Sequence, residues 1–244
     1  KRTGTWKNAS DNMLLKSISL KQGDNKNIAT IKVNYELTEQ ESSLEINYTI
    51  RPEGAINVGM HFIPGTKQLP EIPRFGMRMI LKPEYETMTW LGRGPHESYS
   101  DRKSSALIGL YQGLVWDQYH PYVRAQESAN KTDVRWISLR NKSNKGILIT
   151  GTQPLSASAW NFMQSEIEYI PFDIERRHGG SITKKDFVWL NIDAEQMGVG
   201  GDTTWGAQTH PEYTITPSEM KYSFTIQPLN EGDDEISKSH IRIF

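Results

Sequence analysis

Five acidic residues stand where a carboxylate could do chemistry: Glu97, Asp101, Asp133, Asp193 and Asp202. A glycosidase needs two carboxylates across the scissile bond, about 5 to 5.5 Å apart when it retains configuration and further apart when it inverts. Each of these acids lies beside turn residues or an arginine, as Asp101 lies beside Arg102. Acids in such places most often cap backbone groups or pair with a cation. We therefore expect no catalytic pair within this chain.

The stretch "GVGGDTTWG" (198–206) combines glycines, polar groups and an indole. A sugar presents a face of C–H bonds that packs on an indole plane, while its hydroxyls bond to groups such as Asp and Thr. Gly200 and Gly201 offer backbone freedom, Asp202 offers a carboxylate and Trp205 offers the platform. The stretch predicts a sugar-binding loop. The alternative, in which Trp205 fills the end of a β-sandwich, stays open because Trp is common in both places.

Other reaction chemistries lack their motifs. The sequence has no G-x-S-x-G elbow for a serine nucleophile and no H-E-x-x-H metal site, and it has no cysteine. No helix pattern follows "GVGGDTTWG", so a dinucleotide site is not indicated. We expect no metal ligands among these side chains.

Composition limits the partners. The 244 residues carry 28 Lys and Arg against 29 Asp and Glu, for a net charge of -1, which gives no electrostatic footprint for nucleic acid. No stretch approaches the roughly 20 apolar residues that span a bilayer. We expect neither nucleic acid nor membrane as a partner. The lack of cysteine leaves bacterial periplasm and cytoplasm equally open.

Short alternating segments predict an all-β fold. Apolar residues alternate with polar ones over 31–37 and again over 44–50, which predicts a hairpin with one buried face. Further short strands are predicted at "MRMIL", "ETMTWLG", "KGILITG", "LSASAWNF", "DFVWLNID", "KYSFTIQ" and "HIRIF". Helical periodicity is weak, with at most a short helix after "SDRKSSALIGLYQG". These features favour one antiparallel β-sandwich domain.

Three motifs together resemble one family. The stretches 89–103 ("TWLGRGPHESYSDRK"), 117–136 ("DQYHPYVRAQESANKTDVRW") and 189–205 ("WLNIDAEQMGVGGDTTW") resemble the carboxy-terminal small-chain domain of glycoside hydrolase family 2 β-galactosidases. The resemblance runs from about Trp6 to the end, with the motifs in the family's order. It implies a large antiparallel supersandwich, similar to galactose mutarotase-like folds. We expect residues 1–244 to be one such domain without its first strand or strands.

The resemblance also implies a function. The family's enzymes are retaining β-galactosidases that hydrolyse terminal β-D-galactosides such as lactose, using two glutamates on a catalytic barrel of the same polypeptide. No stretch here resembles the surroundings of those glutamates, so the isolated chain is expected to be inactive. Magnesium and sodium are expected in the full-length enzyme and no cofactor in this chain. The full-length enzyme is expected to be a homo-oligomer.

Site residues follow from the resemblance motif by motif. The loop matching "GGDTTW" implies that Trp205 stacks the substrate at the mouth of the active site, and we expect Asp202 to support that loop. A structural polar network near the barrel interface is implied for the residues that match the other two motifs: Arg93, Glu97, Tyr99, Asp101, Arg102, Glu127, Asp133, Arg135 and Trp136. Plain surface ion pairs are the alternative for this network. Ser128 and Ala129 stand where the family has Asn-Gly, which puts a tight turn there in doubt.

Two other roles remain open for the domain. An autonomous carbohydrate-binding module would bind galactosides by itself and lose binding in Trp205→Ala. A purely structural interaction domain would tolerate that substitution in the full-length enzyme without a change in KM or kcat. The sequence fixes neither the preferred β-galactoside nor the symmetry of an oligomer.

Overall fold

The computed structural model describes residues 3–23, 27–168, 180, 182–203 and 206–240. Within them, eleven strands pair in one antiparallel sheet. The strands are β1 (Leu14–Gln22), β2 (Ala29–Leu37), β3 (Ser42–Ile50), β4 (Ile56–Ile63), β5 (Arg74–Leu81), β6 (Thr87–Gly94), β7 (Leu107–Leu114), β8 (Lys131–Arg140), β9 (Gly146–Trp160), β10 (Val188–Gln196) and β11 (Met220–Leu229).

Helices are few and short in the described part of the chain. The α-helix α1 (Glu235–Ser239) lies near the carboxy terminus. The other helices are 3-10 turns: η1 (Gly4–Trp6), η2 (Thr38–Gln40), η3 (Trp116–Gln118), η4 (Gln164–Ile167) and η6 (Pro211–Tyr213). The prediction of an all-β fold with little helix is confirmed. None of the helices among the described residues is long and apolar enough to cross a membrane.

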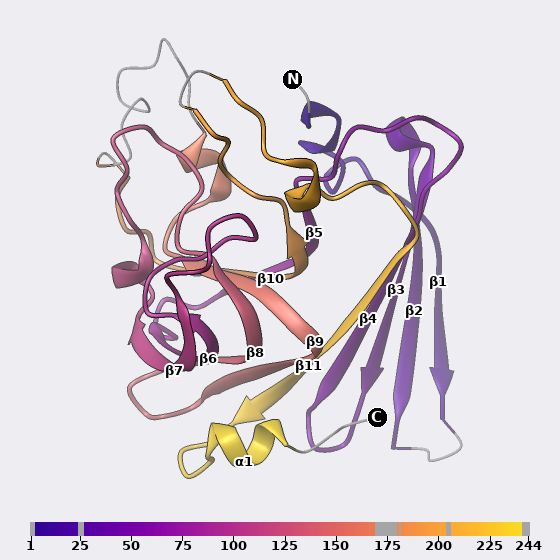
Figure 1. Cartoon of the computed structure of the whole chain (residues 1–244). Helices are drawn as coiled ribbons and strands as arrows, with labels where there is room; N and C mark the ends of the chain where they lie inside the picture. Colours follow the sequence, from indigo (N-terminus) through magenta and orange to yellow (C-terminus); the bar gives the residue numbers. More distant parts are fainter. Residues whose placement is uncertain (1–2, 24–26, 169–179, 181, 204–205, 241–244) are drawn as a thin grey trace.

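The sheet folds back on itself to enclose a core. Its strand order is β1-β2-β3-β4-β11-β9-β8-β6-β7, and β10 joins β9 to β5. Figure 1 shows β1 to β4 together on one side, β6 to β8 on the other, and β9 and β11 crossing between them. One apolar cluster joins both sides, since it contains Phe62 of β4 and Phe224 of β11 as well as Trp90 of β6 and Leu190 of β10. The arrangement is a sandwich made from one continuous sheet.

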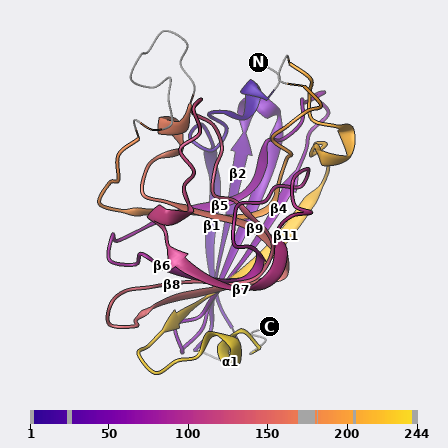
Figure 2. The ribbon, with the colours of Figure 1, turned by 60° about the vertical axis from the view of Figure 1, so that its left-hand side comes forward.

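The predicted hairpin over 31–37 and 44–50 is confirmed. Strands β2 and β3 pair antiparallel with Val33 opposite Ile46 and Tyr35 opposite Leu44. Val33, Leu44 and Ile46 are buried, as the alternation requires, and Leu44 and Ile46 belong to the main core. The turned view in Figure 2 places β2 within the group of strands that includes β4.

Strand β9 corrects one prediction. The segments "KGILITG" and "LSASAWNF" were expected as two strands, but Gly146–Trp160 is a single strand of 15 residues. Its first part pairs with β11 and its last part with β10, while β8 pairs with it on the other edge. A Cβ atom on Gly151 would lie 2.2 Å from the carbonyl oxygen of Gln153, and the register with β8 shifts between Thr150 and Leu155 without ending the strand.

Four strands escaped the sequence prediction, namely β1, β4, β7 and β8. The predicted "HIRIF" strand falls mostly on residues 241–244, which lie outside the described residues, and His240 follows the last turn of α1. A short helix does follow "SDRKSSALIGLYQG", as expected, but it is the 3-10 turn η3.

Two of the three edge strands, β1 and β7, each carry several exposed apolar side chains. Leu15, Ile18 and Leu20 of β1 are 57, 64 and 71% exposed, although they lie opposite Tyr35, Val33 and Ile31 on the core-facing side of β2. Strand β1 therefore lies beyond the edge of the opposite layer, which leaves its apolar side chains uncovered. At the other edge, β7 exposes Leu107, Ile108, Leu110 and Leu114.

Candidate functional site

The three motifs meet at one end of the sandwich because of strand register. Strand β6 ends at Gly94 and pairs antiparallel with β8, which begins at Lys131. Lys131 lies opposite Ala157 of β9, and the neighbouring Ser156 lies opposite Asp193 near the end of β10. The connections after β6, before β8 and after β10 therefore leave the sheet side by side.

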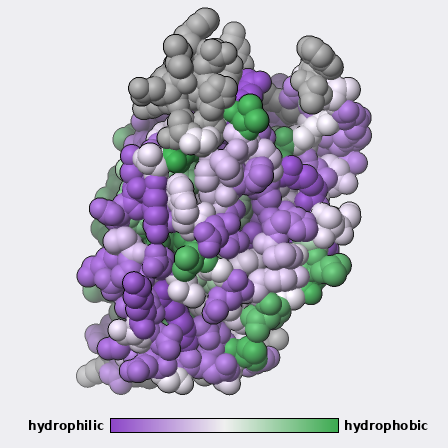
Figure 3. Space-filling model, turned by 90° about the vertical axis from the view of Figure 1, so that its left-hand side faces the viewer, coloured by the Kyte–Doolittle hydropathy of each residue, from purple (hydrophilic) through white to green (hydrophobic). Residues whose placement is uncertain are grey.

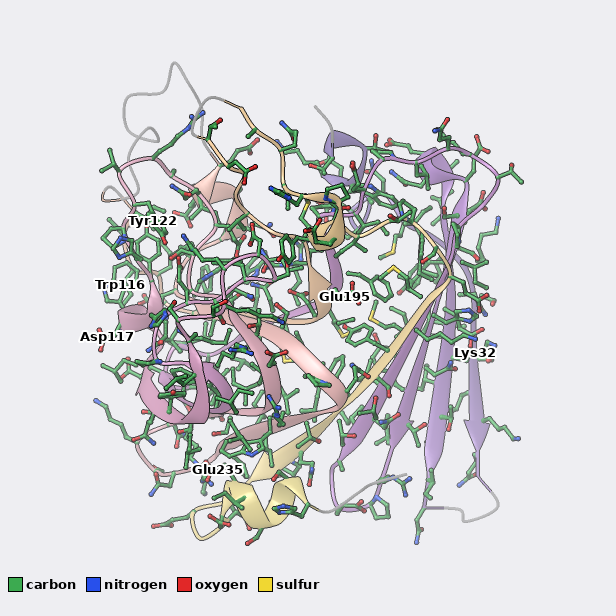
Figure 4. The ribbon with its side chains drawn as sticks, viewed as in Figure 1. Lys32, Trp116, Asp117, Tyr122, Glu195 and Glu235 are labelled. Atoms are coloured by element: carbon green, nitrogen blue, oxygen red, sulfur yellow. The ribbon has the colours of Figure 1, made fainter. Side chains whose placement is uncertain are left out.

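Glu97 is the centre of a hydrogen-bond network between the first two motifs. Its carboxylate accepts hydrogen bonds from Arg102 Nη2 at 2.5 Å, from the Ala129 N–H at 2.7 Å and from Ser128 Oγ at 3.2 Å. The Tyr122 hydroxyl also donates to it. Tyr122 lies on the flank of the molecule near Trp116 and Asp117 (Figure 4). Internal donors thus occupy the Glu97 carboxylate on both oxygens.

Ala129 stands where the motif of the resembled family has glycine. Ala129 adopts a left-handed φ of 71° and is fully buried. The Ser128 carbonyl accepts a hydrogen bond from Trp160 Nε1 at 2.9 Å, and its hydroxyl accepts one from the His120 N–H at 2.9 Å. A left-handed non-glycine residue costs about 1–2 kcal/mol. The surrounding bonds therefore hold Ala129 in a conformation that glycine adopts freely.

Tyr99 lies beneath this network and is 1% exposed. Its ring is 5.2 Å from the Arg102 guanidinium, and its hydroxyl points toward Glu97 at 3.5 Å. Burial raises the pKa of Tyr99, with the nearby carboxylates of Glu127 and Glu97 adding to the effect. The Tyr99 phenol is therefore neutral, and its ring packs behind the Glu97 carboxylate.

A second cluster forms around Asp133. Its carboxylate lies 2.5 Å from Arg93 Nε and 3.7 Å from Lys103 Nζ. Arg93 also donates to the carbonyls of Lys103 at 3.1 Å and Ala106 at 2.8 Å. Burial opposes ionisation, but the Arg93 hydrogen bond and the charge of Lys103 hold the pKa of Asp133 below its ordinary value. Arg93 and Asp133 thus tie the connection after β6 to the start of β8.

Arg135 lies beside the Asp133 cluster, and Trp136 lies outside both networks. Arg135 is exposed and donates to the Asp133 carbonyl. Trp136 is 3% exposed and belongs to a small separate cluster with Leu148 and Leu229. Their place in the sequence motif therefore reflects packing of β8 and not a share in the Glu97 network.

A third cluster of buried charges lies around Arg74, at the start of β5. Arg74 Nε lies 2.8 Å from Asp193 Oδ2, and Arg74 Nη2 lies 3.3 Å from Glu127 Oε1. The guanidinium carbon also lies 5.6 Å from the centre of the Trp160 ring. Burial raises the pKa of Asp193 to about 7, although Arg74 opposes the rise. Burial likewise raises the pKa of Glu127. The Arg74 guanidinium therefore forms ion pairs with two carboxylates.

Sequence reasoning missed two of these buried cations. Arg74 stands between Pro73 and Phe75 at the start of a strand, and only its break in an apolar run could have marked it. Lys131 is 1% exposed, donates to the Pro95 carbonyl at 3.0 Å and lies 4.9 Å from the Trp90 ring. Burial lowers the pKa of Lys131 to about 8.

The glycine-rich loop after β10 meets the first motif. The Gly200 N–H donates to Asp101 Oδ2 at 2.8 Å. Asp202 Oδ1 lies 2.9 Å from His210 Nε2. A hollow of about 490 Å³ lies here, lined by residues of the loop from Val199 to Thr209. Trp205, the expected stacking residue, lies outside the described residues.

Gly201 has a packing role that differs from the expected backbone freedom. A Cβ atom at this position would lie 2.4 Å from the carbonyl oxygen of Ala207. Glycine is needed there because two sides of the loop run in contact.

The structure places each of the five acids singled out in the sequence beside a group of the same chain. The pairs are Glu97 with Arg102, Asp101 with Gly200, Asp133 with Arg93, Asp193 with Arg74 and Asp202 with His210.

Comparisons with known proteins agree on one family. A family model described as beta galactosidase small chain matches residues 1–226. A beta-galactosidase of Priestia megaterium is 36% identical over 93% of this chain, and one of Lactobacillus delbrueckii subsp. bulgaricus is 30% identical over 92%. This chain covers only 21% of either relative, so it spans about a fifth of their length.

Similarity to solved structures is weaker. A galactose 1-epimerase from Lactobacillus acidophilus gives a TM-score of 0.45 at 7% identity, over 87% of this chain and 67% of that one. A GH36 alpha-galactosidase from Geobacillus stearothermophilus gives 0.46 at 9% identity, over 91% of this chain and 28% of that one. At this level the similarity carries no functional argument, and the fold rests on the strand pairing described above.

Proposed function

Because the chain belongs to the beta-galactosidase small chain family, we propose that it is one domain of a retaining β-galactosidase acting on terminal β-D-galactosides such as lactose. In this proposal the domain does not supply the catalytic carboxylates. It completes the mouth of the active site and presents Trp205, with Asp202 in support, to the sugar. The catalytic barrel lies elsewhere in the same polypeptide.

One observation supports the non-catalytic role most directly. The five acids that could have formed a catalytic pair are all engaged with groups inside the chain. A general acid or nucleophile must reach the substrate. Glu97, which has the most donors, would have to give up several hydrogen bonds to do so.

The exposed edge strands support a partner that covers them. Apolar side chains of β1 and β7 are 43–71% exposed, and an uncovered apolar edge favours association. On the face shown in Figure 3, hydrophobic side chains form separate patches within a mainly hydrophilic surface. We assign the covering partner to the remaining four fifths of a polypeptide like the relatives and expect the whole enzyme to be a homo-oligomer.

Metal chemistry is assigned outside this chain. Among the described residues, no group of three or more His, Asp or Glu side chains could hold a metal ion. The described residues therefore offer no such group for magnesium, and we derive no step through one. The magnesium and sodium expected for the whole enzyme would be held by its other domains.

Hydrolysis of a chromogenic β-galactoside tests the proposal. The purified chain, its Trp205→Ala variant and its Glu97→Gln variant are all expected to be inactive. Turnover by the chain that disappears in Glu97→Gln would refute the non-catalytic role. In the full-length enzyme, Trp205→Ala should raise KM for lactose, whereas unchanged KM and kcat would favour a purely structural domain. Saturable galactoside binding by the isolated chain would favour an autonomous binding module.

A further inference from the structure

A hollow of about 670 Å³ crosses the sheet on the face that points away from the main core. One row of side chains forms its floor, with one member from each of seven neighbouring strands. In the strand register each member lies opposite the next: Leu110 of β7, Leu91 of β6, Trp136 of β8, Thr150 of β9, Thr225 of β11, Asn57 of β4 and Thr49 of β3. We call this hollow the sheet groove.

The sheet groove lies apart from the place where the three motifs meet. The chain neighbours of its floor residues, such as Ile149 and Phe224, belong to the main core, so the alternation along each strand directs the floor residues to the other face. Helix α1 contributes Ile236 and Ser239 to its rim. This helix lies at the bottom of Figure 1, whereas the loop after β10 lies at the top.

The charges that line the sheet groove are positive. Arg51, directly after β3, and Arg135 of β8 both line it. No Asp or Glu side chain is among the residues that line it in the described part of the chain. The Asp133 carboxylate, close to Arg135 in sequence, pairs with Arg93 and Lys103 instead. The groove therefore favours an anionic ligand, and a guanidinium binds a carboxylate through two parallel hydrogen bonds.

The remaining lining suits a ring that carries hydroxyl groups. Hydroxyl and amide groups repeat across the strands, at a spacing of about 4.8 Å, in Thr49, Asn57, Thr225 and Thr150. Such groups both donate and accept hydrogen bonds, as the hydroxyls of a sugar do. Leu110 and Ile236, which are 55 and 47% exposed, offer apolar contact to C–H groups. The volume lies within the range of about 300–1,000 Å³ that small-molecule sites have.

We propose that the sheet groove binds a sugar acid, that is, a polyhydroxylated ring with a carboxylate. Arg51 and Arg135 supply the positive charge for the carboxylate, and the floor supplies partners for the ring hydroxyls. A neutral galactoside lacks the group that the two arginines recognise. The sheet groove therefore differs from the proposed mouth of the active site in its place and in its ligand, and it does not depend on the role of Trp205.

The test titrates the purified chain with three probes and follows binding by nuclear magnetic resonance. D-Galacturonate and D-galactose share one ring and differ only in a carboxylate that replaces a hydroxymethyl group, and acetate has the charge without the ring. Galacturonate should bind at least about 10-fold more tightly than either, since it alone engages both the arginines and the floor. Affinity for galactose or acetate equal to that for galacturonate, or no saturable binding of galacturonate, would overturn the proposal.

Variants locate the binding in the sheet groove. Arg51→Gln and Arg135→Gln should each weaken galacturonate binding about 10-fold and leave galactose binding unchanged. Thr150→Val keeps the shape of the side chain and removes one hydroxyl, so it should weaken galacturonate binding about 3- to 10-fold without affecting acetate. Arg78→Gln, at an exposed arginine of β5 outside the groove, is the matched control.

Thermal melting of each variant shows whether it is folded, and the exposed Arg135 is the substitution least able to disturb the fold. Equal losses of galacturonate binding in Arg135→Gln and Arg78→Gln would indicate a general effect of charge and would overturn the proposal. Binding that appears only in a chain ending at His240 would show that the chain's own end competes for the groove, and it would overturn the proposal as well.

Discussion

Arg74 of β5 and Asp193 of β10 form an ion pair across adjacent strands, with 2.8 Å between Nε and Oδ2. The Asp193 side chain is 1% exposed and that of Arg74 is 15% exposed. Gly76, which lies opposite Asp193 in the ladder, makes room for it, because a Cβ atom there would lie 2.0 Å from the carboxylate. Glu127, from the motif at 117–136, lies against the same guanidinium.

Removal of Arg74 should destabilise the chain strongly. Arg74→Met leaves the buried carboxylates of Asp193 and Glu127 without a counter-charge, which costs about 3–5 kcal/mol for a broken buried pair. Urea unfolding of the purified chain measures the loss. Arg78→Met is the matched control, since Arg78 lies on the same strand but is 45% exposed and pairs with exposed Asp11. Surface pairs contribute at most about 1 kcal/mol, so equal losses in the two variants would contradict the buried ion pair.

The same cluster predicts a dependence of stability on pH. Burial raises the pKa of Asp193 from 3.8 to about 7 on folding. Between these values the folded state binds more protons than the unfolded state, so the free energy of unfolding should fall as pH rises. Asparagine at position 193 cannot titrate, so the free energy of unfolding of Asp193→Asn should fall less steeply as pH rises. Chemical unfolding at a series of pH values from about 4 to about 8 gives both slopes. Parallel curves for parent and variant would show that Asp193 keeps an ordinary pKa.

Ala129→Gly should not destabilise the chain, despite removing a buried methyl group. Relief of the left-handed conformation at φ 71° returns about 1–2 kcal/mol, and the greater freedom of glycine in the unfolded state takes back about 0.4–1 kcal/mol. The lost methyl group costs about 0.8 kcal/mol, so we expect a melting temperature close to that of the parent. Ala157→Gly, at a buried alanine within β9, should lower it. A similar loss at both positions would contradict strain at Ala129.

The Asp202–His210 contact should be visible in a histidine titration. The hydrogen bond and charge of Asp202, with a smaller share from Glu212, raise the pKa of His210 above its ordinary value. The contact is complete at acid pH and is lost as pH rises through the raised pKa. Nuclear magnetic resonance of the imidazole should show a lower midpoint in Asp202→Asn, with His210→Gln to assign the signal. An equal His210 midpoint in the parent and in Asp202→Asn would show that Asp202 does not contact His210.

Local patterns predicted some strands and missed others for physical reasons. The alternation in β2 and β3 was readable because one face of that hairpin packs on the core. Strand β1 gave no comparable signal, since all nine of its residues are exposed and a register shift between Leu15 and Ser17 breaks the alternation. The continuity of β9 depends on its partners, which no local pattern encodes.

Some contacts of the candidate site could likewise be predicted from the sequence, and others could not. The motif residues Glu97, Arg102 and Glu127 were predicted as one polar network; in the structure Glu97 pairs with Arg102, whereas Glu127 lies against Arg74. Arg74 was missed because its two carboxylates are far away in the sequence: Asp193 reaches it through the pairing of β5 with β10, and Glu127 from the connection before β8. The hydrogen bond from Gly200 to Asp101 likewise joins two motifs that sequence reasoning treated separately.

Strand β9 also bears on how the molecule comes apart. It pairs with β8, β10 and β11 at once, so the strands on both sides of the core depend on the same 15 residues. Neither side can melt while the other keeps its full set of partners. Thermal or chemical denaturation should thus occur in one cooperative step. A protease that cuts an exposed turn should release no stable subfragment.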